Sequence, residues 1–291
     1  MPAAGATLKV HTPMSPGMRG FRAFIKNRLA VVGAVIIGLA ALFAIAGPLA
    51  TPYDPNAPDL SGRLFGPTMT HLLGTDQLGR DVLARILYGA RYSLLVGVIA
   101  VSIGASVGTI VGLVSGYYGG ITDLILGRIV DTLMAFPGIL LAVAIAAAFG
   151  AGLTNVMIAT GIWSIPTYAR IVRSTVLALA EMDFVLAARA VGVRDRRIIG
   201  RHIFPNAIPP LLVLVSLGMA TAILAAAGLS FLGLGAQPPT AEWGAMLNEG
   251  RAYMRVGPGL AIYPGVAIML VVIGFNLVGD GLRDALDPKR R

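Results

Sequence analysis

The most regular feature of the chain is a series of long apolar runs separated by shorter polar segments. Each run has about 20 residues or more, and a helix of that length crosses the roughly 30 Å hydrocarbon core of a bilayer. The chain is therefore predicted to be an all-α polytopic membrane protein. Its six predicted transmembrane helices are residues 29–50, 92–116, 130–149, 153–172, 207–234 and 259–279.

Prolines and glycines add detail to this pattern. The short glycine-containing turn at 150–152 predicts that the third and fourth spans form a helical hairpin. Pro137 and Pro166 lie within or near the ends of these spans, and each removes a backbone hydrogen-bond donor. They mark either hinges used in gating or kinks that packing against neighbouring helices tolerates.

A stripe of small residues follows one face of the second span. A small residue recurs at every fourth position, a pattern that lets two helix backbones approach closely. Packing within the bundle is the favoured interpretation, and direct lining of a pore is the alternative. The stripe consists of Ala100, Gly104, Gly108, Gly112 and Gly116.

Basic residues between the spans predict the orientation. Lys and Arg favour cytoplasmic segments, and they are denser in 1–28, 173–206 and 280–291 than in 51–91 and 235–258. An even number of spans also places both termini on one side, so both are predicted to be cytoplasmic. The predicted parts are a cytoplasmic N-terminal segment (1–28), a first transmembrane helix (29–50), an extracytoplasmic loop (51–91), a five-helix core (92–279) that includes the cytoplasmic segments 117–129 and 173–206, and a cytoplasmic tail (280–291).

Composition agrees with a membrane protein in contact with lipid. Hydrophobic residues make up 56% of the chain and charged residues 13%, against about 25% charged residues in a typical soluble domain. The net charge is +9, but the basic residues lie in loops beside apolar spans, which indicates topology rather than nucleic-acid binding. The chain has no cysteine, which excludes a disulfide framework, an Fe–S site and a thiol nucleophile.

The polar residues offer no catalytic site. The histidines, at positions 11, 71 and 202, lie outside the predicted spans, and no HExxH, GxSxG or GxxxxGK[ST] motif occurs. The chain is therefore predicted not to be an enzyme, and not to hydrolyse ATP itself. Proton coupling usually needs ionisable groups inside the spans, and the nearest, Asp131 and Asp280, are expected to be solvated or helix-capping.

The longest cytoplasmic segment, 173–206, has the pattern of two short helices. Gly192 is expected to end the first helix, Asp195 to cap the second, and Pro205 to end it. Such short helices are marginal alone in water, so they need a surface to pack on.

This segment resembles the "EAA" signature of ABC importer permeases, with Leu186 in the place of the family's Glu. In that family the segment is a coupling helix that docks in a groove of the cytosolic ATPase. The resemblance implies a hinge at Gly192, and Glu181 or Asp183 as a substitute carboxylate for the missing Glu. The coupling loop implied is Glu181, Asp183, Leu186, Ala187, Ala188, Gly192, Arg194, Asp195 and Pro205.

Four further blocks, at 72–82, 130–137, 228–235 and 275–288, are similar to the C-type permease subunit of oligopeptide and dipeptide importers. The resemblance implies a type I ABC importer permease in a bacterial inner membrane. Its implied partners are a B-type permease subunit, two cytosolic ATPase domains that bind ATP and Mg²⁺, and an extracytoplasmic peptide-binding protein. The chain itself needs no cofactor or metal.

Charged residues of the predicted outer loop, Asp76, Arg80, Asp81 and Arg85, are candidates for docking the binding protein, or else belong to a structural turn. Two other functions remain open. The same architecture serves importers of nickel or other small solutes. A passive channel or secondary carrier is the more distant alternative.

Overall fold

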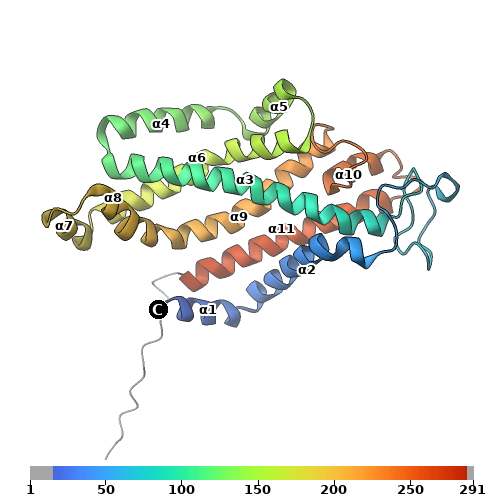
Figure 1. The fold of residues 1–291 in the computed structure, drawn as a ribbon, viewed down its shortest axis with the longest axis horizontal. Coiled ribbons are helices and arrows are strands. Elements are labelled where there is room, and N and C mark those ends of the chain that lie inside the picture. Colours follow the sequence, from blue (N-terminus) through green and yellow to red (C-terminus); the bar gives the residue numbers. More distant parts are fainter. Residues whose placement is uncertain (1–15, 287–291) are drawn as a thin grey trace, which may run out of the picture.

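The computed structural model describes residues 16–286, and this part of the chain contains helices and no strands. The helices run side by side along the long axis of the molecule, in alternating directions (Figure 1). The lengthwise elements are α2 (Arg28–Ala50), α3 (Val82–Tyr118), α4 (Gly120–Ala135) with α5 (Gly138–Phe149), α6 (Leu153–Ala180), α9 (Phe204–Phe231) and α11 (Gly259–Leu286). The predicted all-α fold is confirmed.

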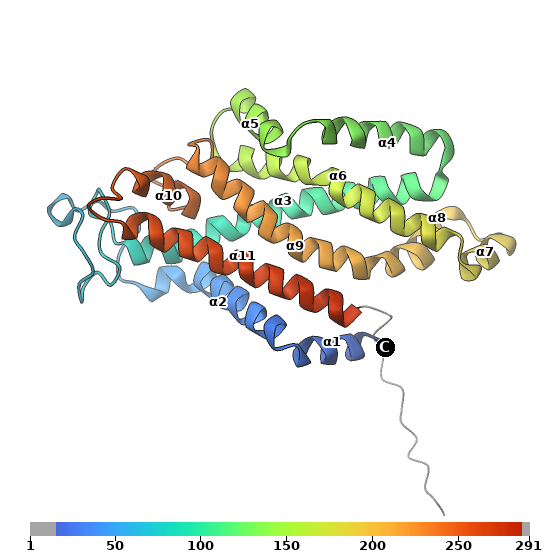
Figure 2. The ribbon, with the colours of Figure 1, turned by 180° about the vertical axis from the view of Figure 1, so that it is seen from behind.

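The two ends of the bundle differ. One end, called the α7 end below, has α7 (Asp183–Ala190), α8 (Asp195–Ile198) and the C-terminal part of α11. The other, the α10 end, has α10 (Trp243–Arg251) and the segment between α2 and α3, with the short 3₁₀ turn η1 (Leu60–Gly62). From behind, α1 (Pro16–Lys26), α2 and α11 line the edge opposite to α4 and α5 (Figure 2).

The lengthwise helices are not all equally apolar. By length and composition, four helical stretches can span a membrane, namely α2, α3, Asp195–Phe231 and α11, and the bent pair of α4 and α5 makes a fifth. Helix α6 has 28 residues but carries Arg170 and Arg173, and it does not meet the same test. It lies along α3, and this contact covers much of its surface.

The third predicted span is not one continuous helix. Helix α4 begins ten residues before the predicted start, and it meets α5 at a bend of 86°. Pro137 causes the break, because a proline disfavours helical geometry at the preceding residue, and Phe136 is extended. Pro166, by contrast, lies inside the continuous helix α6. The predicted tight turn at 150–152 is present between α5 and α6.

Several predicted loops are helical. Segment 117–129 belongs mostly to α3 and α4, and residues 173–180 complete α6. Helix α1 lies within the segment 1–28, for which no helix was predicted. Residues 1–15 and 287–291 of the predicted cytoplasmic termini lie outside the described part of the chain.

The glycine stripe of α3 packs directly against α6. A Cβ at Gly108 would lie 2.7 Å from the carbonyl oxygen of Ile165, and one at Gly112 would lie 2.6 Å from that of Ala169. One turn further, a Cβ at Gly116 would lie 2.9 Å from the carbonyl oxygen of Arg173. The obstacles are backbone atoms, which cannot rotate away. The stripe therefore serves bundle packing, the favoured interpretation of the sequence.

We expect Gly112→Ala to destabilise the bundle by about 1–3 kcal/mol, because the added methyl group forces α3 and α6 apart. Gly38→Ala is the control, since nothing lies within 4 Å of a Cβ at that position of α2. Thermal unfolding in mild detergent measures both. Equal melting temperatures for the two variants would contradict the close packing of α3 on α6.

Candidate functional site

The segment between α6 and α9 folds onto the α7 end of the bundle. Val185 of α7 and Ile198 of α8 are fully buried, in one apolar cluster with Val172 and Val176 of α6 and Ile203. The segment is therefore a packed part of the fold rather than a free loop. This packing is what short helices require, because they are marginal alone.

Gly192 ends α7 as the sequence predicts. Its φ is +77°, a conformation that glycine adopts without steric cost. Its N–H donates to the carbonyl of Arg189, and the next N–H, of Val193, donates to the carbonyl of Ala188. This pair of bonds is a Schellman motif, so the direction in which the chain leaves α7 depends on Gly192.

Asp195 has a different role from the predicted cap. It is the first residue of α8, the N-cap is Arg194, and the Arg194 side chain makes no capping bond. Asp195 Oδ1 accepts a hydrogen bond of 2.7 Å from the Tyr117 hydroxyl at the end of α3. The Arg189 guanidinium lies 4.8 Å from the centre of the same ring. Tyr117 thus connects both α7 and α8 to α3.

Pro205 does not end the second helix. Helix α8 continues through a π-helical turn, Ile199–Ile203, into α9, and Pro205 lies in the first turn of α9. The predicted coupling segment is therefore α7 and the Gly192 turn, followed by the start of one long helix.

The outer face of α7 is apolar, and charged residues lie nearby in the chain. Leu186 is 48% exposed, Phe184 40% and Val191 77%. Glu181, Asp183 and Ala187 are also exposed, whereas Ala188 is buried. Exposed arginines lie in α7 and in the segment that follows it: Arg189, Arg194, Arg196, Arg197 and Arg201. An apolar patch with a charged rim is typical of a surface that binds another protein.

A second polar group lies at the α10 end, where Asp76, Arg80 and Arg85 are buried together with the nearly buried Glu249 of α10. Arg80 Nε lies 2.6 Å from Asp76 Oδ2, and Arg80 Nη2 lies 3.0 Å from Glu249 Oε2. Arg85 is within 3.5 Å of both carboxylates. Two positive and two negative charges therefore balance one another, as buried charges require.

The predicted docking charges are thus turned inward. Asp76, Arg80, Asp81 and Arg85 are each at most 4% exposed, so these side chains are not placed to contact a binding protein directly. Asp81 caps α3 by accepting from the amide of Ala84, and its other oxygen lies 2.8 Å from His71 Nδ1. The structural interpretation of this turn accounts for all four.

Two carboxylates of this end were not singled out in the sequence. Glu249 completes the ion cluster, and Glu242 is only 2% exposed at the start of α10. Glu242 accepts hydrogen bonds from the amides of Gly244 and Ala245. Burial raises the pKa of the Glu242 carboxyl, and the two amide hydrogen bonds act in the opposite direction. No local motif marks Glu249, because its partners Arg80 and Arg85 are far away in sequence, whereas Glu242 is the local N-cap of α10.

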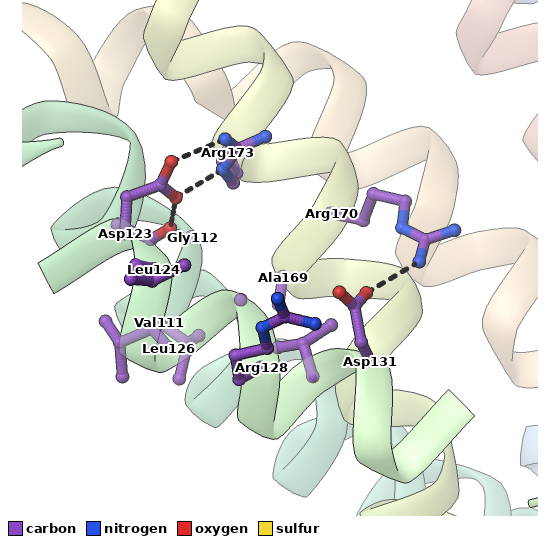
Figure 3. A pocket seen from close by; sticks show the side chains of 13 residues that line it. Val111, Gly112, Asp123, Leu124, Leu126, Arg128, Asp131, Ala169, Arg170 and Arg173 are labelled. Carbon is purple, nitrogen blue, oxygen red and sulfur yellow. Dashed lines mark hydrogen bonds and ion pairs between the residues drawn. The ribbon is translucent and has the colours of Figure 1, made fainter. Parts of the chain in front are cut away.

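A polar cavity of about 430 Å³ lies between α3, α4 and α6 (Figure 3). Arg173 forms two hydrogen bonds of 2.6 Å with Asp123, whose carboxylate also accepts from Ser115. Further along α4, Arg170 and Asp131 form an exposed pair at 3.5 Å. Arg128 lies between the two pairs, without an ion pair of its own among residues 16–286. These contacts tie α4 to α6.

Asp131 lies near the C-terminal end of α4, close to the bend between α4 and α5, and its side chain is exposed, as expected for a solvated carboxylate. Its pairing with Arg170 is between two largely exposed side chains. No group of three or more His, Cys, Asp or Glu side chains within residues 16–286 is arranged to hold a metal ion.

Comparison with known proteins identifies the family. A family model described as "Binding-protein-dependent transport system inner membrane component" matches residues 108–291. The chain belongs to this family. A second model, "N-terminal TM domain of oligopeptide transport permease C", matches residues 15–67. The chain is therefore a non-catalytic permease subunit of an ABC importer, as the resemblance implied, and its family acts in membranes.

Relatives with known names match this chain over nearly its whole length. The dipeptide transport system permease protein DppC of Alkalihalophilus pseudofirmus is 49% identical over 97% of this chain and 92% of its own length. The glutathione transport system permease protein GsiD of Escherichia coli is also 49% identical, with the same coverage.

Solved structures agree on the fold. The inward-facing MetNI methionine ABC transporter matches with a TM-score of 0.56 at 21% identity, over 70% of this chain and 96% of that chain. An amino acid ABC transporter matches with a TM-score of 0.52 at 18% identity, over 67% and 91%. These likenesses concern the fold alone, which is that of a type I ABC importer permease.

We expect Arg80→Met to destabilise the permease by about 3–5 kcal/mol, because it leaves the buried Asp76 and the partly buried Glu249 with one cation. Arg170→Met is the control, since an exposed pair contributes at most about 1 kcal/mol. Denaturant unfolding in detergent compares the two variants. A small loss for Arg80→Met would show that the cluster at the α10 end is not structural.

Proposed function

We propose that this permease forms half of the translocation path of an ATP-driven importer of dipeptides or oligopeptides. Four blocks of the sequence resemble C-type permeases of such importers, and a relative 49% identical is named as a dipeptide permease. The second relative is named for glutathione, itself a short peptide. Small peptides are the substrate class common to these observations.

The coupling element in this proposal is α7. Its outer face presents Phe184, Leu186 and Val191 to solvent, while its inner face is bonded and packed to α3 and α6. A surface of this kind suits the groove of a cytosolic ATPase. Leu186 in the family's Glu position then makes an apolar contact, with Glu181 and Asp183 exposed nearby as the available carboxylates.

The remaining assignments follow from the family architecture. The partners are a B-type permease, two ATPase domains and an extracytoplasmic peptide-binding protein. ATP and Mg²⁺ bind to the ATPase domains, and this chain binds neither. The α7 end faces the cytoplasm with both termini, since the basic residues around α7 favour that side. The α10 end then faces outward, and the surface around the buried ion cluster receives the binding protein.

Purification in mild detergent, followed by mass spectrometry, tests the proposal. We expect a second permease, one or two ATPases and a peptide-binding protein to co-purify, and uptake of peptides into vesicles to require ATP hydrolysis. Recovery of a metal- or sugar-binding protein instead would indicate that the importer transports another solute. Recovery of the intact chain alone, with ATP-independent uptake, would favour a channel or carrier.

We expect Gly192→Pro to uncouple ATP hydrolysis from transport while leaving membrane insertion intact. Proline cannot adopt a φ of +77°, and it lacks the N–H that donates to Arg189. The matched control is Gly192→Asn, because asparagine tolerates this conformation and keeps the N–H. The measurement is the ratio of peptide uptake to ATP hydrolysis in proteoliposomes. An unchanged ratio for the proline variant would place the coupling turn elsewhere.

A further inference from the structure

A groove of about 160 Å³ lies between the middle parts of α6 and α9, and its lining is mixed, with hydroxyl groups mostly on α6 and apolar Leu214 and Leu217 on α9. Its α9 wall includes Thr221, and its α6 wall presents hydroxyl groups on successive turns together with one indole. The polar and aromatic side chains that line it are Thr160, Trp163, Ser164, Thr167, Tyr168 and Thr221. Both helices continue for at least one turn beyond the groove at either end, so the groove lies at mid-height of the bundle.

The hydroxyl groups of the groove still have hydrogen-bonding capacity that no protein group in residues 16–286 satisfies. Thr160 is 2% exposed, and its hydroxyl has no hydrogen-bond partner. Ser164 and Thr221 donate to carbonyls of their own helices, at 2.8 Å and 3.1 Å, and each oxygen can still accept. A buried hydroxyl without a partner costs about 1–3 kcal/mol. The groove is therefore suited to a polar occupant.

Lipid is a poor occupant of this groove. Hydrocarbon chains offer no hydrogen bonds, and polar side chains at mid-membrane usually face a bundle interior or a water-filled cavity. The depression on another face of α9 is different, because Leu224, Met269 and Ile273 line it with other apolar groups. The groove differs from this depression in the hydroxyl groups of α6 and of Thr221 that line it.

Trp163 connects the groove to the break between α4 and α5. A Cβ at Gly138, the first residue of α5, would lie 1.6 Å from the indole Nε1 of Trp163. The indole therefore occupies the space that glycine leaves open beside the bend at Pro137. Any side chain at 138 requires the indole of Trp163, which also lines the groove, to move.

We propose that this groove is the part of the solute path that the subunit contributes at mid-membrane. Its hydroxyl groups bind the backbone amides and carbonyls of a passing peptide, and Trp163, positioned by Gly138, sets the width. This assignment rests on the proposed peptide transport. Backbone recognition by hydroxyls is independent of side-chain identity, and this suits a solute class with variable side chains.

Single-cysteine labelling tests the path, since the natural chain contains no cysteine. Thr167→Cys and Thr221→Cys are compared with Leu224→Cys, one turn further along α9, in the assembled importer in proteoliposomes. The probe is a charged methanethiosulfonate reagent. Only the thiolate reacts, and lipid suppresses its formation, so labelling at 167 and 221 should be at least about tenfold faster than at 224. Equal rates at all three positions would overturn the proposal.

ATP-driven uptake of radiolabelled dialanine in the same vesicles separates this inference from the proposed function. Uptake without labelling at 167 and 221 would leave a peptide importer whose path lies elsewhere. Labelling without ATP-driven uptake would indicate that the groove is filled with water but that the protein does not import peptides. Thr221→Val should reduce dialanine uptake, whereas Thr221→Ser, which keeps the hydroxyl, should not. Equal uptake by both would exclude hydroxyl recognition of the peptide.

A double-mutant cycle tests the role of Trp163. Gly138→Ala should slow labelling of Thr221→Cys, Trp163→Ala should accelerate it, and the variant with both substitutions should behave like Trp163→Ala alone. Additive effects of the two substitutions would show that Gly138 does not act through the indole.

Discussion

The close approach of α3 and α6 is the constraint on which the other contacts depend. Over Gly108, Gly112 and Gly116 the space for a Cβ is taken by backbone atoms of α6, so the two helices meet almost without intervening side chains. This fixes α6 against α3, and it places the other faces of α6 against different neighbours. Arg173 reaches Asp123 of α4, and Val176 supports α7. A spacer of one methyl group would disturb all of these contacts together.

Charged groups are paired where the helices end, whereas two buried hydroxyl groups in the middle of the bundle, those of Thr109 and Thr160, have no hydrogen-bond partner among the described residues. At the α10 end, four charges neutralise one another between the start of α3 and α10, which fixes the outer segments without exposing charge. At the α7 end, Tyr117 is bonded to Asp195 and lies under Arg189. Between these ends, Thr160 has no partner. A rigid frame with an incompletely satisfied polar interior is what a path for a polar solute requires.

The features that depend on local sequence were predictable, and those that depend on distant partners were not. Apolar runs predicted where five of the lengthwise helices lie, although α3 begins at 82 rather than 92, inside the predicted outer loop, and α6 and α11 extend past the predicted ends. Gly192 predicted the end of α7 because its left-handed conformation is a local requirement. The third pass was misjudged, since hydropathy does not detect the extended residue that Pro137 imposes at 136. The docking role assigned to Arg80 ignored Glu249, which lies 169 residues away. No sequence pattern joins those two residues, whereas the folded chain does.

Helix α6 relates the two proposed functional surfaces to each other. It is continuous from 153 to 180, and Val176, packed beneath α7, lies 13 residues from Trp163, or about 20 Å along the helix axis. In the proposed importer, a displacement of α7 by an ATPase would be transmitted to the groove along this continuous helix, without crossing a loop. At the groove, the same helix meets α5 beside the 86° bend, where Gly138 leaves room for the indole. The bend is the point at which movement of α6 relative to α5 would change the width of the groove, while Asp123 and Arg173 keep the other end of α4 attached to α6.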